Sequence, residues 1–168
     1  MKPFEEQSYP VFDMFSKQWA LVTAGEPGHF NTCTIAWGSL GSIWDGRGRG
    51  RSIVTVYVNP DRYTYEFLKE SDTFTVSWFP REYRKALGYL GSHSGRDGDK
   101  VAAAGLTPKE LAGGVTFEEA NLTFVCHKLY QGEFQREGLA DEINHGIYEN
   151  WQPHWMFVGE IVHVEDTR

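Results

Sequence analysis

The sequence has few cysteines, no long apolar segment and fewer cations than anions. Two cysteines in 168 residues cannot form a disulfide framework or a four-cysteine zinc site. No apolar run approaches the roughly 20 residues of a membrane-spanning helix, and residues 1–8 lack the basic-then-apolar order of a signal peptide. Sixteen Lys and Arg against 23 Asp and Glu disfavour nucleic-acid binding, because phosphate neutralisation needs clustered cations. We therefore expect a cytoplasmic protein with no nucleic-acid or membrane partner.

The histidines and cysteines also lack the spacing of a metal site. None of the six histidines forms an i, i+4 pair on a clear helix, and neither cysteine belongs to a CxxC pair, so we predict no metal. Cys33 has the character of a small apolar strand residue rather than of a nucleophile.

Aromatic residues, by contrast, are abundant. Eleven Phe, eight Tyr and six Trp make up 15% of the chain, which is more than a core of this size needs. The length predicts one domain spanning residues 1–168. A hydrophobic fraction of 40% and a charged fraction of 23% are typical of a folded globule.

Period-2 patterns and β-branched runs dominate the chain and predict strands. Helical patterns are fewer and short. The expected strands cover residues 19–24, 31–37, 52–58, 73–79, 115–117, 122–129 and 154–164. The expected helices cover 63–69, 81–90 and a stretch ending at 104, with 131–153 as a long loop containing one helical turn near 141–145. This pattern indicates a mainly β fold, an antiparallel barrel with short flanking helices.

The segment Asn31 to Gly38 has the first pattern that suggests a binding site. On a strand, Thr32, Thr34, Ala36 and Gly38 share one narrow face. A flat ligand could approach the backbone there, with hydroxyls bonding its edge. The alternative is that small residues simply suit a strand packed against another layer, and the pattern alone favours that alternative.

Two further segments combine turn residues with cations. Residues 59–65 read as a strand end, a turn and a helix start, where free backbone N–H groups favour an anion. Residues 91–100 hold glycines, serines, Arg96 and Lys100 before a short helix, which suits a phosphate. Each segment has a structural alternative, namely a capped helix or an exposed turn. The Gly-Arg tract 46–51 reads as a hairpin tip between two strands.

The three segments together resemble the flavin reductase-like family with an FMN-binding split barrel, and the flavoredoxin-like branch most closely. The resemblance rests on Asn31-Thr32-Cys33-Thr34 with Trp37-Gly38, on Arg62-Tyr63-Thr64-Tyr65-Glu66-Phe67, and on Ser94-Gly95-Arg96-Asp97 with Lys100. It implies a six-stranded antiparallel Greek-key split barrel with short flanking helices. It also implies a homodimer with FMN near the subunit interface.

The resemblance implies a role for twelve positions around FMN. Asn31, Thr32 and Thr34 would line the isoalloxazine and ribityl part, and Trp37 would support the ribityl–phosphate end. The phosphate would be approached by Arg62, Tyr63, Thr64, Ser94, Gly95 and Lys100. Three departures are noted. Cys33 stands where a larger apolar residue is typical. His93 stands where a Lys is more usual, so that one phosphate cation is either lost or becomes pH-dependent. The Gly-Arg tract 46–51 is longer than the usual hairpin and would clamp the pyridine nucleotide, the partner subunit or neither.

The implied activity is that of an NAD(P)H:flavin oxidoreductase. NADH or NADPH would pass a hydride to N5 of FMN, and the reduced flavin would pass electrons onward to an acceptor. No catalytic protein residue is expected, because the flavin supplies the chemistry. Two alternatives stay open: a flavoredoxin-type electron carrier without its own NAD(P)H oxidation, and a split-barrel module that binds haem or another flat ligand, with His93 as the candidate iron ligand.

Overall fold

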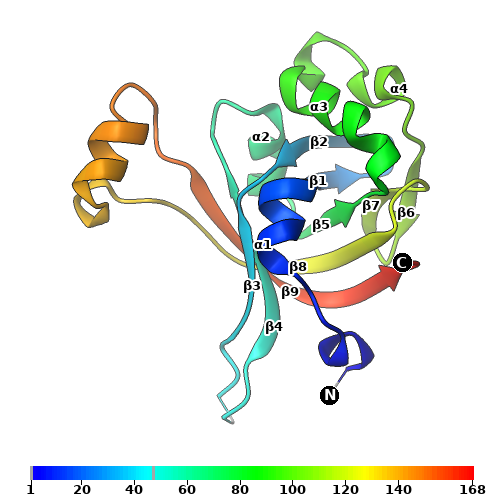
Figure 1. Cartoon of the computed structure of the whole chain (residues 1–168), viewed down its shortest axis with the longest axis horizontal. Helices are drawn as coiled ribbons and strands as arrows, with labels where there is room; N and C mark the ends of the chain where they lie inside the picture. The colour runs from blue at the N-terminus through cyan, green and yellow to red at the C-terminus, as the bar shows by residue number, and fades with distance from the viewer. Residues whose placement is uncertain (1, 47) are drawn as a thin grey trace.

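The computed structural model describes residues 2–46 and 48–168. Seven strands form one antiparallel sheet that curls into a barrel (Figure 1). Along the sheet they run β2 (His29–Ile35), β1 (Ala20–Glu26), β5 (Thr73–Trp78), β8 (Leu122–Glu133), β9 (Trp155–Asp166), β4 (Arg51–Val58) and β3 (Gly38–Ile43). A separate antiparallel hairpin consists of β6 (Pro108–Leu111) and β7 (Gly114–Phe117). The mainly β fold class is confirmed.

The expectation of six strands was too low, because the described residues contain nine. β3 was not predicted, since its sequence Gly-Ser-Leu-Gly-Ser-Ile has weak strand propensity. Pairing with β4, from Gly38 opposite Val56 to Ile43 opposite Arg51, holds it in place. β6 begins with a proline and carries Lys109 and Glu110, and it exists through its pairing with β7. Tertiary pairing therefore overrides local propensity at both strands.

The helices lie close to their predicted positions. α2 (Tyr63–Glu70) and α4 (Lys100–Ala104) match, and Asp99 caps α4 by accepting a hydrogen bond from Ala102 N. α3 (Arg84–Ser92) follows a 3₁₀ turn and runs through Gly91, where the sequence had predicted its end. A helical segment was missed near the N-terminus, where α1 (Val11–Asp13) continues as a turn over Met14–Gln18.

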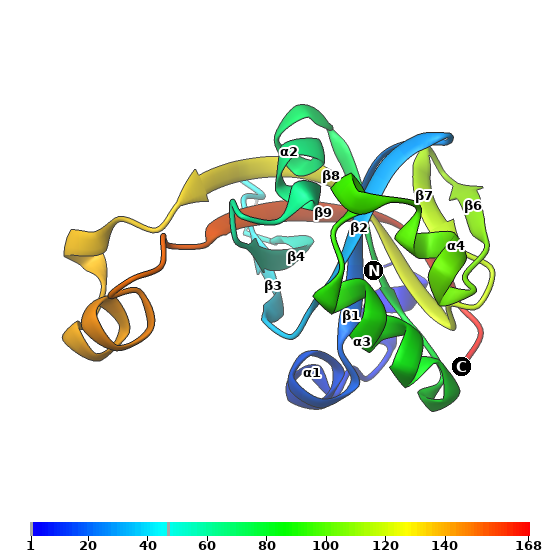
Figure 2. The ribbon, with the colours of Figure 1, turned by 90° about the horizontal axis from the view of Figure 1, so that it is seen from above.

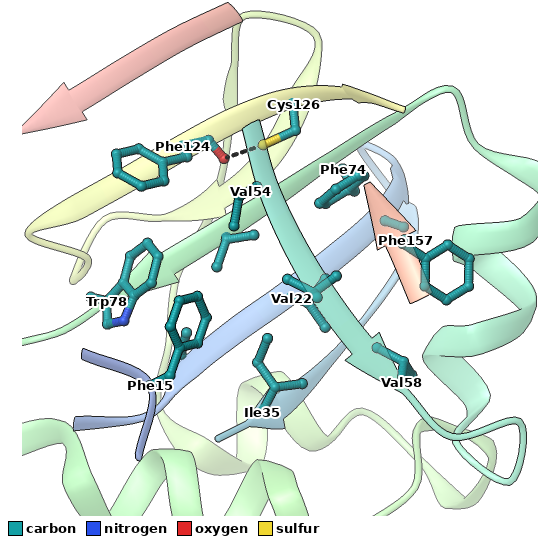
Figure 3. Packing of buried hydrophobic residues seen from close by; sticks show 14 of the residues in the cluster. Phe15, Val22, Ile35, Val54, Val58, Phe74, Trp78, Phe124, Cys126 and Phe157 are labelled. Atoms are coloured by element: carbon teal, nitrogen blue, oxygen red, sulfur yellow. Dashed lines mark hydrogen bonds between the residues drawn. The ribbon is translucent and has the colours of Figure 1, made fainter. Parts of the chain in front are cut away.

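The main core fills the interior of the barrel (Figure 3). Val22, Ile35, Val54 and Phe74 are among its buried members. The N-terminal helical segment closes one end. Its Phe15 ring meets the indole of Trp78 edge-on at 5.4 Å, and Trp78 Nε1 donates to the Met14 carbonyl at 3.0 Å. A second cluster packs α3 and α4 onto the outside of the barrel: Leu21, Phe79, Leu87, Leu90, Val101, Leu106 and Phe117.

Two features project from the barrel (Figures 1 and 2). The β3–β4 hairpin carries the 46–51 tract between its paired strands, as the sequence predicted, although Arg47 lies outside the described residues. The other is an arm of residues 134–154, which joins β8 to β9 and contains a helical turn at Glu142–Ile147. The long loop predicted over 131–153 is shorter, because β8 continues to Glu133.

Among the residues that the structure describes, no helix has the length and apolar character needed to cross a membrane.

Candidate functional site

Two adjoining pockets lie where the sheet is open, beside the edge strand β2. The first has a volume of about 300 Å³ and the second about 220 Å³. They share Cys33, Arg62 and Trp151. The start of α2 and the end of α3 border the first pocket, and the end of β4 borders the second. Together they form one continuous candidate site at the split in the barrel.

Two cations line the first pocket and also hold the C-terminus of α3. Arg62 Nη1 donates to the Gly91 carbonyl at 2.6 Å, and Lys100 Nζ donates to the carbonyls of Leu90 at 3.1 Å and His93 at 3.0 Å. These carbonyls lack helical partners, so the cations satisfy them. An ammonium has three donors and a guanidinium five, which leaves donors free for a ligand.

Lys100 is nearly inaccessible to solvent, with 7% of its surface exposed. Burial lowers the pKa of its ammonium, and the Arg62 cation adds to that effect. Burial raises the pKa of the neighbouring Cys33 thiol, so Cys33 remains a neutral thiol at pH 7. The first pocket therefore has two cationic groups, Arg62 and Lys100, against one carboxylate, Asp61.

The wall behind the first pocket is fixed by a buried hydrogen bond between α2 and β2. Thr64 Oγ1 donates to Asn31 Oδ1 at 2.6 Å. The loop after α3 approaches so closely here that a Cβ on Gly95 would lie 2.0 Å from Asn31 Nδ2. Gly95 is therefore required for the loop to reach the strand.

The loop after α3 presents two more polar groups to the first pocket. Ser94 Oγ accepts from Arg96 N at 3.2 Å, which leaves its hydroxyl proton free to donate. The His93 ring stacks on Tyr89 with a 3.8 Å centroid separation, and its Nδ1 lies 2.9 Å from the Tyr89 carbonyl. The first pocket is thus rich in hydrogen-bond donors.

The second pocket is lined by aromatic rings. Trp37, 44% exposed, lies 4.6 Å from the His154 ring, and Trp151 meets the same ring edge-on at 4.8 Å. Trp151 Nε1 also donates to Asp61 Oδ2 at 3.1 Å, which ties the arm to the start of α2. Tyr57 completes the aromatic lining. Such walls suit a planar ligand.

His154 is a buried, neutral base within this pocket. Burial lowers its pKa to about 4, and Arg62 adds to the effect while Asp61 opposes it. Asn59 Nδ2, which can only donate, lies 3.5 Å from Nδ1, and the Tyr148 hydroxyl lies 2.8 Å from the same atom. Nδ1 therefore accepts, and the ring proton lies on Nε2. His154 is therefore a neutral hydrogen-bond donor at pH 7.

Nine of the twelve predicted site residues line the two pockets: Cys33, Thr34, Trp37, Arg62, Tyr63, Thr64, His93, Ser94 and Lys100. Asn31 and Gly95 are in mutual contact and line a neighbouring pocket of about 460 Å³, which Tyr63 and Lys100 also line. Thr32 does not reach either pocket. Its side chain is fully buried, with Oγ1 2.8 Å from Thr23 Oγ1, so any part it takes in a site comes from its backbone. Trp37 lies in the second pocket, away from Ser94 and Lys100.

Nine lining residues were not among the predicted ones: Ile35, Ala36, Tyr57, Val58, Asn59, Asp61, Ser92, Trp151 and His154. Asn59, Asp61 and Ser92 belong to segments that the sequence had already singled out. Trp151 and His154 come from the arm, which lies some 90 residues further along the chain than the start of α2. No local pattern marked either residue as part of a site, and the surplus of Phe, Tyr and Trp included only Trp151.

The open antiparallel barrel with a donor-rich site at its edge strand defines a split-barrel protein. The sequence matches the flavin reductase-like domain family over residues 12–168. The chain belongs to this family, and the resemblance read from the sequence is confirmed.

Solved structures share the fold. An FMN-binding protein from Thermus thermophilus aligns with a TM-score of 0.68 at 22% identity, covering 96% of this chain and 78% of the other. A flavoredoxin from Methanosarcina acetivorans gives 0.66 at 22%, covering 96% and 74%. An NADH:FAD oxidoreductase from Streptomyces globisporus gives 0.65 at 18%, covering 89% and 74%. No curated protein matches the sequence.

Proposed function

We propose that this protein binds FMN across the two pockets and catalyses NAD(P)H-dependent flavin reduction. Family membership supports the coarser part of this proposal, a flavin-related oxidoreductase. The observation that supports FMN binding is the division of the site into a cationic, donor-rich pocket and an adjoining aromatic pocket.

The first pocket fits the phosphate of FMN. Phosphate is bound by charge-assisted hydrogen bonds from cations and hydroxyls. Arg62 and Lys100 keep free donors beyond those given to α3, and Ser94 keeps a free hydroxyl proton. The cations are pre-positioned by their carbonyl partners, so little side-chain entropy is lost when a phosphate binds.

The second pocket fits a flat heteroaromatic ring. Trp37 and Trp151 offer apolar faces, and β2 is an edge strand whose outer side pairs with no other strand among the described residues. Nε2–H of His154 adds a neutral donor that does not depend on pH near neutrality. These groups would orient the ring and bond its polar edge.

When bound, FMN would accept a hydride from NADH or NADPH at N5 and pass the electrons onward. The residues of this chain would bind the cofactor, orient its ring and exclude water. No side chain in the two pockets is required to act as a nucleophile or as a general acid.

Stopped-flow mixing tests the activity. The protein is equilibrated with FMN without oxygen and mixed with NADH or with NADPH. Rapid loss of the visible flavin absorbance, faster than for free FMN, supports the reductase. Flavin that binds but stays oxidised with both donors overturns the reductase and supports the electron carrier. A Soret band after addition of haemin, with no flavin bound, would support the haem module.

A further inference from the structure

A third pocket, with a volume of about 460 Å³, adjoins the first pocket and is not used by the proposed flavin site. It shares only Tyr63 and Lys100 with the first pocket and no residue with the second. The loop after α3 packs tightly at the boundary, because a Cβ on Gly95 would lie 2.0 Å from Asn31 Nδ2 and 3.3 Å from the Tyr63 ring. A ligand in the third pocket would therefore lie beside a flavin that spans the other two.

The walls of the third pocket are mainly aromatic and apolar. The rings of His29 and Phe67 lie 5.0 Å apart, and Tyr63 meets Phe67 edge-on at 5.1 Å. Further apolar lining comes from β2, from α4 and from the chain that leads into β6: Phe30, Val101, Ala102, Leu106 and Pro108. A pocket of this volume and character suits a small, flat, largely apolar molecule.

An acid and a base, Asp99 and Lys100, also line the third pocket, and both are already hydrogen-bonded within the protein. Lys100 Nζ donates to the Leu90 and His93 carbonyls, and Asp99 Oδ1 accepts from Ala102 N. Because the two side chains carry opposite charges, their fields oppose each other inside the pocket. This balance favours a neutral ligand over an ion.

Asn31 supplies a polar group that lacks a partner. Only 7% of its surface is exposed, and its Oδ1 accepts from Thr64 Oγ1 at 2.6 Å. Within residues 2–46 and 48–168, its Nδ2 group has no hydrogen-bond acceptor. Buried amide donors are normally paired, and Asn31 lines the third pocket. An oxygen acceptor on a ligand would complete the hydrogen bonding of this side chain.

We propose that the third pocket binds a neutral aromatic carbonyl compound, with its ring system among Tyr63, Phe67 and Phe30 and its carbonyl oxygen accepting from Asn31 Nδ2. This site goes beyond flavin binding and does not depend on it. The occupant is a second small molecule, held next to the cationic first pocket and away from the aromatic second pocket.

Prodan, a neutral naphthyl ketone whose fluorescence changes in apolar surroundings, is a suitable probe. Two alanines of α4 give a matched pair of variants, since both are exposed and only Ala102 lines the third pocket. A102W should fill the pocket and abolish saturable prodan binding, whereas A103W should bind prodan as the wild type does. Equal binding in the wild type and A102W, or no saturable binding in the wild type, would overturn the site.

N31D tests the hydrogen bond to the carbonyl. The substitution keeps an oxygen acceptor for Thr64 but replaces the Nδ2 donor with a second oxygen, which repels a carbonyl. We expect N31D to bind prodan about tenfold more weakly than the wild type does. Ethylnaphthalene, which has no carbonyl, should displace prodan with the same dissociation constant in both proteins. An equal loss of affinity for both compounds would overturn the contact with the carbonyl.

Equilibrium dialysis of prodan with and without saturating FMN tests whether the third pocket is separate from the flavin site. We expect the same amount of prodan bound per chain in both cases. Displacement of prodan by FMN would overturn the separate site and leave the proposed function intact. A protein that binds prodan but no flavin would overturn the proposed function and leave the third pocket as a ligand site.

Discussion

At the residue scale, the site is built from side chains that do two things at once. Arg62 and Lys100 could be read from the sequence as phosphate donors or as solvated charges, and neither interpretation includes their contacts with the carbonyls of α3. Those contacts join residues up to 29 positions apart, so no local pattern could show them. The same contacts explain how a buried lysine is tolerated next to an arginine.

Ser94 offers a direct test of the phosphate contact. S94A removes a free hydroxyl donor, and a hydrogen bond to a charged group contributes about 1.5–3 kcal/mol. We expect S94A to bind FMN at least about tenfold more weakly than the wild type does, and to bind riboflavin equally well. S16A is the matched control, since Ser16 bonds within its own helical segment. Equal FMN affinity in wild type and S94A would exclude Ser94 from the phosphate contact.

His154 predicts how stability depends on pH. Its pKa is about 4 in the folded protein against an ordinary 6.5, so below pH 6.5 the unfolded chain takes up a proton that the folded chain refuses. Its contribution to stability is therefore complete above pH 6.5 and is lost as the pH falls towards 4. Urea unfolding at pH 7 and pH 4.5 should show a smaller loss for H154Q than for the wild type. An identical loss would contradict the buried neutral imidazole.

At the scale of elements, the strands with regular alternation and the helices α2, α3 and α4 were predictable, because their patterns are local. The Gly- and Ser-rich β3, the Pro-initiated β6 and the N-terminal helical segment were not, since pairing with β4, pairing with β7 and packing under Trp78 stabilise them. All three segments singled out in the sequence border the first pocket. The arm was the missing fourth element, because its approach to Asp61 and Asn59 depends on the course of β8 and β9.

Arg136 holds the arm in its folded form. Its guanidinium donates to Asn144 Oδ1 and to the carbonyls of Tyr148 and Trp151, all within 3.0 Å. R136A should increase amide hydrogen exchange across residues 142–152 and weaken FMN binding severalfold, because Trp151 forms part of both pockets. The melting temperature of the protein should change little in R136A. E137A, an exposed neighbour, is the control. Unchanged exchange in R136A would show that the arm does not depend on this side chain.

At the scale of the whole molecule, the projecting parts leave large apolar side chains uncovered. Ile43 and Trp44 on the β3–β4 hairpin are 40% and 51% exposed, and Ile147 on the arm is 44% exposed. Aromatic and large apolar groups of this kind are enriched in interfaces. A homodimer, as the sequence resemblance implied, would cover them and use part of the aromatic surplus.

Sedimentation equilibrium tests this arrangement. We expect a mass of two chains for the wild type and a shift towards one chain for W44D combined with I147D, since buried charges without partners destabilise an interface. V162D, at an exposed position on β9, serves as the control. A wild type that sediments as a single chain would contradict the homodimer.

Equilibrium titration with FMN tests whether the two pockets form one flavin site. Protein is added to FMN while the visible absorption and the flavin fluorescence are recorded. We expect a saturable change that reaches its end point at one flavin per chain and that disappears when an excess of a phosphomonoester competitor displaces the flavin. No spectral change at protein concentrations up to roughly 1 mM, the upper end of ordinary enzyme–ligand affinities, would contradict it.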